Sequence, residues 1–323
     1  MTPLVRASLS ACLVLSLAEG AARVGVRAAA PHCYDTTRNL REGYWAQYTA
    51  PRKRRPDQRL IILITNSQGR MRRGGGLDAY PARLQQQLAQ WDPQHEYLLA
   101  NWAMTGGNLA EMIVLAARAA AHRPDAVLLV TYTRNFREDQ TRRTLEESWS
   151  DVSHLAYLPE VRRHLSPWFL EQFQVRSPRG WLAARSVLVQ LHERFVSLVK
   201  GQTVRPGGRP ALITAEPWTG MSSRLLDEFY RTFRHGLPTT PLVIVSMPLN
   251  PVRFTPESWP NILAFFPKAQ GRLAGEPRVA VLDATGIVET RHFSDDTHVG
   301  TEGHDQFARW LFPRVAAVLE TPS

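Results

Sequence analysis

The sequence predicts an α/β fold built on a parallel sheet, because short continuous apolar runs alternate with helical patterns. Such runs are typical of strands buried on both faces. Between them, apolar residues recur at the spacing of one buried helix face. Strand, helix, strand in this order favours parallel pairing. Five runs are expected as strands, at residues 60–64, 97–100, 126–130, 242–245 and 279–282.

The first run, 60–64, ends in the polar turn Asn66-Ser67-Gln68-Gly69. Ligands of open α/β sheets bind just beyond the carboxyl ends of the strands, which is where Ser67 is expected. If a helix follows, the backbone N–H groups of the turn point toward whatever Ser67 contacts. The same turn is also typical of an ordinary strand-to-helix connection, so Ser67 is a candidate only in combination with other residues.

Two further strand ends carry residues suited to a site. The run at 97–100 leads to Gly106, and the run at 126–130 leads to Asn135. The carboxyl ends of parallel strands meet at one edge of a sheet, where ligands bind. We therefore expect Ser67, Gly106 and Asn135 to lie near one another.

Helix signals agree with this order of elements. A helix is expected over 81–88, and Asn108 with Glu111 three residues later predicts a capped helix start. Apolar residues over 225–233 form a helical face that Gly236 is expected to end as the first residue beyond the helix. Further helices are expected around 262–266 and over the C-terminal residues, the last with a kink near Pro313.

Residues of about 136–210 interrupt the pattern and predict a helical insertion after the third strand. Two interpretations stay open: a lid or partner surface above the site, or a small core belonging to the insertion itself. The aromatic residues that raise the question are Trp149, Trp168, Phe169, Phe173 and Trp181.

Residues 1–30 are expected to be a signal or membrane-anchor segment, because a basic start at Arg6 precedes a short apolar core. The apolar part is shorter than the roughly 20 residues of a spanning helix. An amphipathic helix on the domain surface is the alternative. Residues 31–58 are expected to form a linker or N-terminal loop, and 59–323 the main domain. The segment favours export or anchoring on the periplasmic or extracellular side over a cytoplasmic location.

The two cysteines, Cys12 and Cys33, predict neither an intrachain disulfide nor a cysteine-based metal site. The formal net charge of +10 leaves nucleic acid, anionic lipid and acidic polysaccharide open as partners. Neither zinc-finger spacing nor an aromatic-basic RNA-binding signature is found, so we expect no nucleic-acid partner. A membrane surface stays open as a partner, and the oligomeric state is not predicted.

The polar strand ends and the C-terminal segment Asp295-Asp296-Thr297-His298 together predict acyl transfer by a serine. In this hypothesis His298 takes the Ser67 proton, and Asp295 holds the imidazole tautomer. The backbone N–H groups of Ser67 and Gly106 and the side-chain amide of Asn135 form the oxyanion hole. No cofactor or metal is expected.

This constellation resembles the SGNH (GDSL-like) hydrolase family, which carries Ser, Gly, Asn and Asp-x-x-His in this order. The resemblance covers about residues 59–135 and 240–320, and implies a flavodoxin-like three-layer sandwich of about five parallel strands. The segment from Asn101 to Gly106 also looks like a family segment. Two motifs depart from the common pattern: Gly-Asp-Ser is Thr65-Asn66-Ser67 here, and Gly-x-Asn-Asp is Thr133-Arg134-Asn135-Phe136.

Simpler roles compete with the catalytic one. Asn135 is also suited to capping a helix, Gly106 to a tight turn, and either Asp295 or Asp296 to capping a loop. A metal cluster of His292, His298 and His304 with the two aspartates is a further alternative, although no metalloprotease-type helical spacing supports it.

The first hypothesis from the sequence is an extracytoplasmic serine esterase of SGNH type, acting on an ester such as an acetylated polysaccharide. An O-acyltransferase to a cell-surface polysaccharide with the same residues is the second hypothesis. An inactive carbohydrate-binding or scaffold protein is the third.

Overall fold

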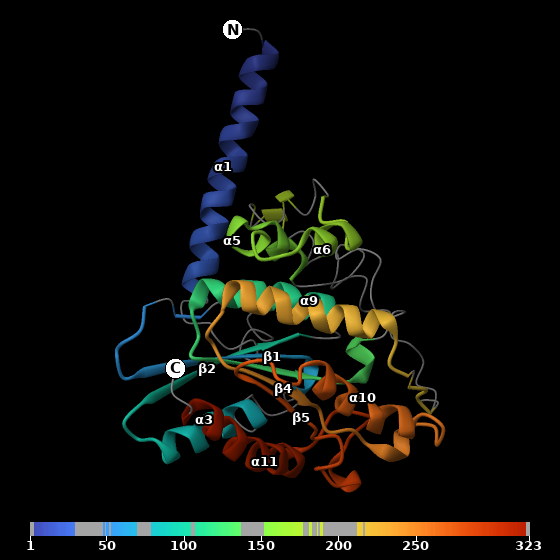
Figure 1. Ribbon diagram of the computed structural model, residues 1–323. Helices are drawn as coiled ribbons and strands as arrows, with labels where there is room; N and C mark the ends of the chain where they lie inside the picture. Colours follow the sequence, from blue (N-terminus) through green and yellow to red (C-terminus); the bar gives the residue numbers. More distant parts are fainter. Residues whose placement is uncertain are drawn as a thin grey trace.

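The computed structural model carries an N-terminal helix, a central sheet and the helices that cover it (Figure 1). It describes residues 3–29, 48, 50–51, 53–69, 79–104, 107–136, 152–176, 181–182, 186, 188–189, 212–215 and 217–320.

The sheet has five parallel strands in the order β2-β1-β3-β4-β5, which confirms the predicted fold class. The chain passes from β1 outward to β2 and then returns to the other side of β1, so the strand order reverses between β1 and β3. Crevices that bind ligands form at such a switch point. The strands are β1 (Gln58–Thr65), β2 (Glu96–Ala103), β3 (Ala126–Thr131), β4 (Leu242–Ser246) and β5 (Val279–Leu282).

Helices cover both faces of the sheet (Figure 1), which explains why β1 reads as a continuous apolar run. Leu60, Ile62 and Ile64 belong to one buried cluster, while Ile61 and Leu63 belong to another on the opposite face. The first cluster includes α4 (Leu109–Ala119), α9 (Gly220–Gly236) and α10 (Trp259–Arg272). The second includes α3 (Tyr80–Trp91) and α11 (Thr301–Glu320). The α11 helix continues through Pro313.

The helix boundaries match the predicted signals with one correction. Asn108 and Glu111 form the expected reciprocal capping box at the start of α4. The prediction that Gly236 lies beyond α9 was wrong, because Gly236 is its last helical residue. A Cβ on Gly236 would come within 2.6 Å of the Ala120 Cβ. Close packing between segments, rather than a left-handed cap, therefore favours glycine here.

The insertion packs on the first helical layer. Its described elements are η5 (Ser153–Tyr157), α5 (Pro159–Arg162) and α6 (Pro167–Gln172). Phe169 and Phe173 are buried in the same cluster as α4 and α9, so these two aromatics extend the main core. Trp181 is 49% exposed, and Trp149 lies outside the described residues.

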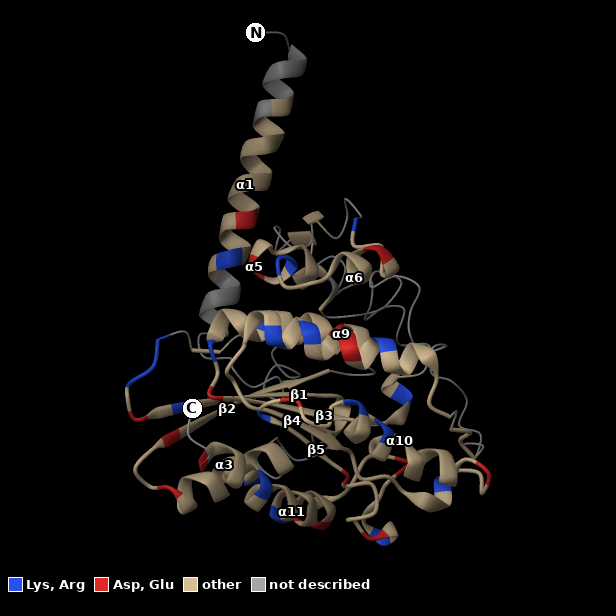
Figure 2. Ribbon diagram, viewed as in Figure 1, with Lys and Arg blue, Asp and Glu red and all other residues tan. Residues whose placement is uncertain are grey.

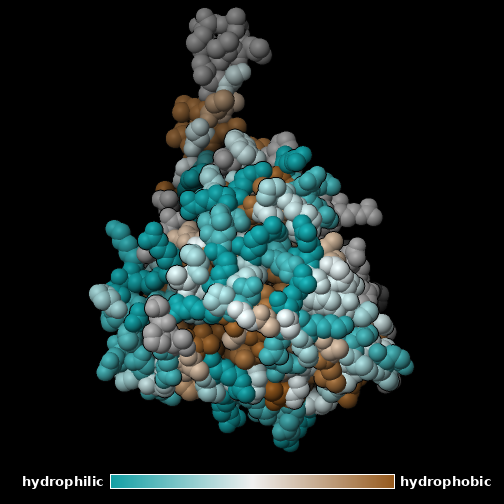
Figure 3. All heavy atoms as spheres, in the orientation of Figure 1, coloured by the Kyte–Doolittle hydropathy of each residue, from teal (hydrophilic) through white to brown (hydrophobic). Residues whose placement is uncertain are grey.

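The N-terminal helix α1 (Pro3–Ala29) projects away from the sandwich (Figure 1) and carries a band of apolar surface (Figure 3). Leu13, Val14, Leu15 and Leu17 are each more than 60% exposed. Glu19 accepts hydrogen bonds from the Ser186 side chain and the Leu188 backbone, which ties the helix to the insertion. Among the helices in the described ranges, none combines the length and apolarity needed to cross a membrane. Cys12 is exposed, and Cys33 lies outside those ranges.

Basic residues are spread over α9, α10 and α11, alongside acidic ones, as Figure 2 shows. Some arginines bind backbone carbonyl groups of other segments. Arg234, on α9, donates to the backbone carbonyls of Thr240 and Arg278, and Arg54 donates to the carbonyls of His122 and Arg123. These two arginines therefore stabilise connections within the fold.

Candidate active site

Ser67 begins a short 3-10 turn, η1 (Ser67–Gly69), directly after β1. The turn is held close to the sheet, because the Asn101 amide on β2 donates to the Gly69 carbonyl at 2.9 Å. The Asn66 side chain also accepts from the Gln68 N–H at 3.2 Å. A Cβ on Gly69 would overlap the Thr65 side chain, so only glycine fits this approach. The turn leaves Ser67 half-buried while its neighbours are buried.

The structure brings Ser67, His298 and Asp295 together across 231 residues of chain. The Ser67 Oγ lies 2.9 Å from the His298 Nε2, and the His298 Nδ1 lies 2.8 Å from the Asp295 Oδ2. The loop that carries the two residues closes on itself, since the Ser294 N–H donates to the His298 carbonyl at 2.8 Å. This is the nucleophile, base and orienting-acid geometry of a serine triad.

Asp295, rather than Asp296, orients the imidazole. Its Oδ1 accepts from the backbone N–H groups of Thr297 and His298, while its Oδ2 pairs with the ring. Burial alone would raise the pKa of Asp295, but the hydrogen bonds from His298 and Thr297 outweigh it and hold that pKa well below its usual range. The carboxylate is therefore ionised at neutral pH and suited to stabilising an imidazolium.

Asn135 lies in η4 (Thr133–Phe136), directly beyond β3, with its amide fixed. Its Oδ1 accepts from the Thr131 hydroxyl at 2.9 Å and the Tyr132 N–H at 3.0 Å, while its Nδ2 donates to the Gly107 carbonyl. The remaining N–H of this amide has no partner within the described residues. Asn135 is therefore buried and oriented, with one donor left for an oxyanion.

The other two predicted oxyanion donors are backbone groups. The Ser67 N–H has no hydrogen-bond partner in the part of the chain that the structure describes. Gly106 lies outside the described residues, but its neighbour Gly107 is buried and bonded to Asn135. The Gly106 assignment therefore stays a prediction.

Asn250 is a supporting residue that the sequence reasoning missed. It lies beyond β4, its N–H donates to the Asp296 carbonyl at 3.0 Å, and its Nδ2 donates to the Asp295 carbonyl at 3.2 Å. The side chain is 5% exposed. Its place after a buried strand, like that of Ser67 and Asn135, was the available signal.

The histidines near the site do not form the alternative metal cluster. Within the described ranges, no group of three or more His, Cys, Asp or Glu side chains is arranged to hold a metal ion. His304 is buried, accepts from the Tyr80 N–H at its Nδ1 and stacks against the Tyr80 ring. Burial, with smaller effects from Arg83 and His298, lowers the pKa of His304 to about 4.

This buried imidazole predicts a pH-dependent stability. The unfolded chain binds a proton on His304 below about pH 6.5, whereas the folded chain does so only below about pH 4. The contribution of the neutral His304 to the free energy of unfolding is therefore complete above pH 6.5. It falls as the pH drops toward 4, by up to about 1.4 kcal/mol per pH unit. Urea unfolding should show that the free energy of unfolding decreases less between pH 7 and pH 5 for His304→Gln than for wild type. His292→Gln, on the neighbouring loop, is the control; an unchanged slope in His304→Gln contradicts this assignment.

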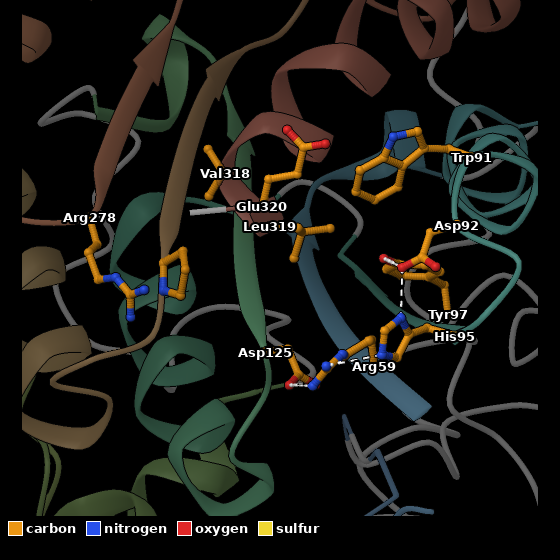
Figure 4. Close-up of a pocket in the computed structure, with 11 residues that line it drawn as sticks. Arg59, Trp91, Asp92, His95, Tyr97, Asp125, Arg278, Val318, Leu319 and Glu320 are labelled. Carbon is orange, nitrogen blue, oxygen red and sulfur yellow. Dashed lines mark hydrogen bonds and ion pairs between the residues drawn. The ribbon is translucent and has the colours of Figure 1, made fainter. Parts of the chain in front are cut away.

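A separate cavity of about 370 Å³ lies at the opposite end of the sheet (Figure 4). Arg59 and Tyr97 reach it from the amino-terminal parts of β1 and β2, and Trp91 lines another side. Its His95 contacts Asp92 at 2.7 Å and Arg59 at 3.1 Å. No residue of the predicted site lines this cavity, so it is distinct from the Ser67 site.

No protein-family model matches the chain, and no curated protein matches it. It is similar to the solved structure of a carbohydrate esterase family 3 protein from Talaromyces cellulolyticus, with 9% identity, a TM-score of 0.44 and coverage of 82% of this chain and 100% of that one. A putative GDSL-like lipase from Bacteroides ovatus has 12% identity, a TM-score of 0.45 and coverage of 83% and 55%. An acetyl esterase has 10% identity, a TM-score of 0.45 and coverage of 82% and 100%.

The names of these three structures describe two esterases and a putative lipase. At such identities and TM-scores the likeness carries no argument about activity. The geometry around Ser67 therefore bears the functional conclusion.

Proposed function

We propose that this chain is a serine ester hydrolase of SGNH type. The observation that carries the proposal is the continuous hydrogen-bonded row from Ser67 through His298 to the ionised Asp295. The row lies at the carboxyl edge of a parallel sheet, beside the fixed amide of Asn135. An arrangement of this kind activates a hydroxyl and stabilises the charge that its attack creates.

In the proposed reaction the Ser67 Oγ attacks the ester carbonyl carbon while the His298 Nε2 takes the hydroxyl proton. The carbonyl oxygen becomes an oxyanion, which the Ser67 N–H and the Asn135 Nδ2–H stabilise. His298 then gives the proton to the leaving alkoxide as the carbon–oxygen bond breaks. This leaves the acyl group on the Ser67 Oγ. Water then gives a proton to His298 as it attacks the acyl carbon. As the bond between this carbon and the Ser67 Oγ breaks, His298 returns the proton to Ser67 and a carboxylic acid is released.

The family resemblance makes an acylated carbohydrate the first substrate class to test. Turnover of 4-nitrophenyl acetate, followed by acetate release from acetylated polysaccharides, tests the proposal. Ester turnover that requires Ser67 is expected. If folded protein hydrolyses none of these esters but binds the polysaccharide, the chain is a carbohydrate-binding protein instead. Acetate transfer to an added sugar acceptor in preference to water would make it a transferase.

We also infer that α1 places the enzyme at a membrane surface on the extracytoplasmic side. Leu13 and Leu17 are 61% and 65% exposed, and neighbouring apolar side chains point to other sides of the helix. A helical segment with apolar residues on most sides, such as Ala11 to Ala18 of α1, is suited to a lipid environment. The eight residues from Ala11 to Ala18, at a rise of about 1.5 Å each, are long enough to reach into one leaflet. The formal net charge of +10 adds attraction to anionic lipid.

Flotation of the full chain with phosphatidylglycerol vesicles tests this inference. A double variant, Leu13→Asp with Leu17→Asp, should bind at least about 10-fold less, because each leucine loses about 1.5–3 kcal/mol of burial in lipid. Leu263→Asp, at an exposed leucine on α10, is the matched control and should float like wild type. Equal flotation of the double variant and wild type contradicts the anchoring role of α1.

A further inference from the structure

An ion pair joins the turn that carries Asn135 to the loop that carries the triad acid and base. Arg134 immediately precedes Asn135, and Asp296 immediately follows Asp295. The Arg134 Nη1 lies 3.4 Å from the Asp296 Oδ2, and the two side chains are 33% and 19% exposed. A guanidinium therefore stands at the rim of the site, adjacent in sequence to a proposed oxyanion donor.

Asp296 forms only a weak ion pair with the Arg134 guanidinium. A well-formed arginine–carboxylate pair is bidentate, with two parallel contacts of about 2.7–2.9 Å. Here a single contact of 3.4 Å is formed, and the buried Arg134 Nε has no hydrogen-bond partner. The Nε itself is buried, but a third of the side chain is open to solvent, so another anion can reach the exposed part of the guanidinium.

The loop does not depend on Arg134 for its position. Asn250 holds the carbonyls of Asp295 and Asp296 with two hydrogen bonds. The Asp295 carboxylate holds the backbone N–H groups of Thr297 and His298 with two more. Since these four contacts already fix the loop, the weak ion pair adds little to it. Arg134 is better suited to contacting substrate than to holding the triad.

A second arginine lies at the neighbouring strand end. Arg253 follows β4 in η6 (Pro251–Arg253), and its N–H donates to the Asn250 carbonyl at 3.1 Å. Its Nε is also buried without a hydrogen-bond partner. β3 and β4 are paired neighbours, so both arginines lie at the carboxyl edge that carries the triad. The edge of the sheet that carries the triad therefore also carries two arginines.

We propose that Arg134 recognises a carboxylate on the substrate, so that the preferred esters are O-acyl groups on acidic, uronate-containing polysaccharides. This inference rests on the proposed esterase function and names its substrate class. The substrate carboxylate displaces Asp296 from the guanidinium and accepts hydrogen bonds from two of its N–H groups. Arg134 is a specificity-determining residue here, and the net charge of +10 draws such polymers to the protein.

The test compares kcat/KM on acetylated polygalacturonate with kcat/KM on acetylated glucomannan, a neutral polymer. Wild type should prefer the acidic polymer. Arg134→Gln should lower this preference by about 10 to 100-fold, mainly through KM, because a charge-assisted hydrogen bond to substrate is lost. Asp296→Asn should raise the preference severalfold by removing the competing carboxylate. Arg291→Gln removes a surface arginine, 74% exposed, and should leave the preference unchanged.

Equal losses on both polymers in Arg134→Gln would overturn the proposal and make Arg134 a positioning residue for the loop. A wild type that prefers the neutral polymer would overturn it as well. Failure of the esterase function is a separate outcome, in which wild type hydrolyses neither polymer. In that case, calorimetry measures the binding of unacetylated polygalacturonate to wild type and to Arg134→Gln. Weaker binding by Arg134→Gln supports recognition of the carboxylate by Arg134. Equal binding by the two proteins, or no binding by wild type, contradicts it.

Discussion

Replacing Ser67 with alanine is expected to lower kcat/KM for 4-nitrophenyl acetate by at least about 10⁴-fold. The hydroxyl that His298 contacts at 2.9 Å is the proposed nucleophile, and no acyl-enzyme forms without it. His298→Ala should cause a loss of similar size, because the serine is then no longer deprotonated. Residues of a triad act as one unit, so the double variant should lose no more activity than Ser67→Ala alone.

The control for this series is Ser223→Ala on α9, which removes a hydroxyl that accepts a 2.6 Å hydrogen bond from Trp218. It should keep wild-type activity, since Ser223 lies outside the site. Each loss of activity can be expressed as an increase in activation free energy. If the increase in the double variant equals the sum of the increases in the two single variants, Ser67 and His298 act separately. In that case the row of hydrogen bonds is not the catalytic unit.

Replacing Asn135 with alanine is expected to lower kcat by about 10² to 10³-fold, the usual cost of losing one oxyanion donor. KM should change little, because the donor strengthens its contact only as the carbonyl oxygen becomes negative. The buried Thr131 hydroxyl and Tyr132 N–H also lose their acceptor, so a loss of stability of about 1–3 kcal/mol is expected as well.

Asn261→Ala is the matched control for Asn135, because the Asn261 amide donates to the Ala215 carbonyl on the body of the protein. Measuring kcat beside the thermal unfolding midpoint separates the two effects. A variant at Asn135 that is destabilised but retains wild-type kcat would assign this side chain to the support of the turn alone.

The strands were predictable because both faces of the sheet are covered. Burial on both faces leaves β1 and β3 as uninterrupted apolar runs, and such runs are visible in a sequence. The order in which strands pair is set by contacts between distant segments, which composition and periodicity do not contain. The role of Gly236 was misassigned for a related reason. A glycine at a helix end serves either a left-handed cap or close packing, and only the position of Ala120 distinguishes them.

The positions of the candidate site residues were predictable where residues suited to catalysis directly follow a strand. Ser67 and Asn135 follow apolar strands directly, and Asp295 stands three residues before His298, a spacing that lets both side chains meet within one loop. Asn250 escaped prediction because it acts on backbone carbonyls 45 residues away. The contact between Arg134 and Asp296 spans 162 residues, and no local pattern indicates it.

Labelling with a fluorophosphonate probe tests the central claim most directly, since such probes react with activated serines and not with ordinary ones. Wild-type protein should be labelled, and peptide mapping should place the adduct on Ser67. His298→Ala, which retains the serine but lacks its base, should be labelled far more slowly. Folded wild-type protein that takes up no label, or an adduct on another serine, would contradict the assignment of Ser67 as the nucleophile.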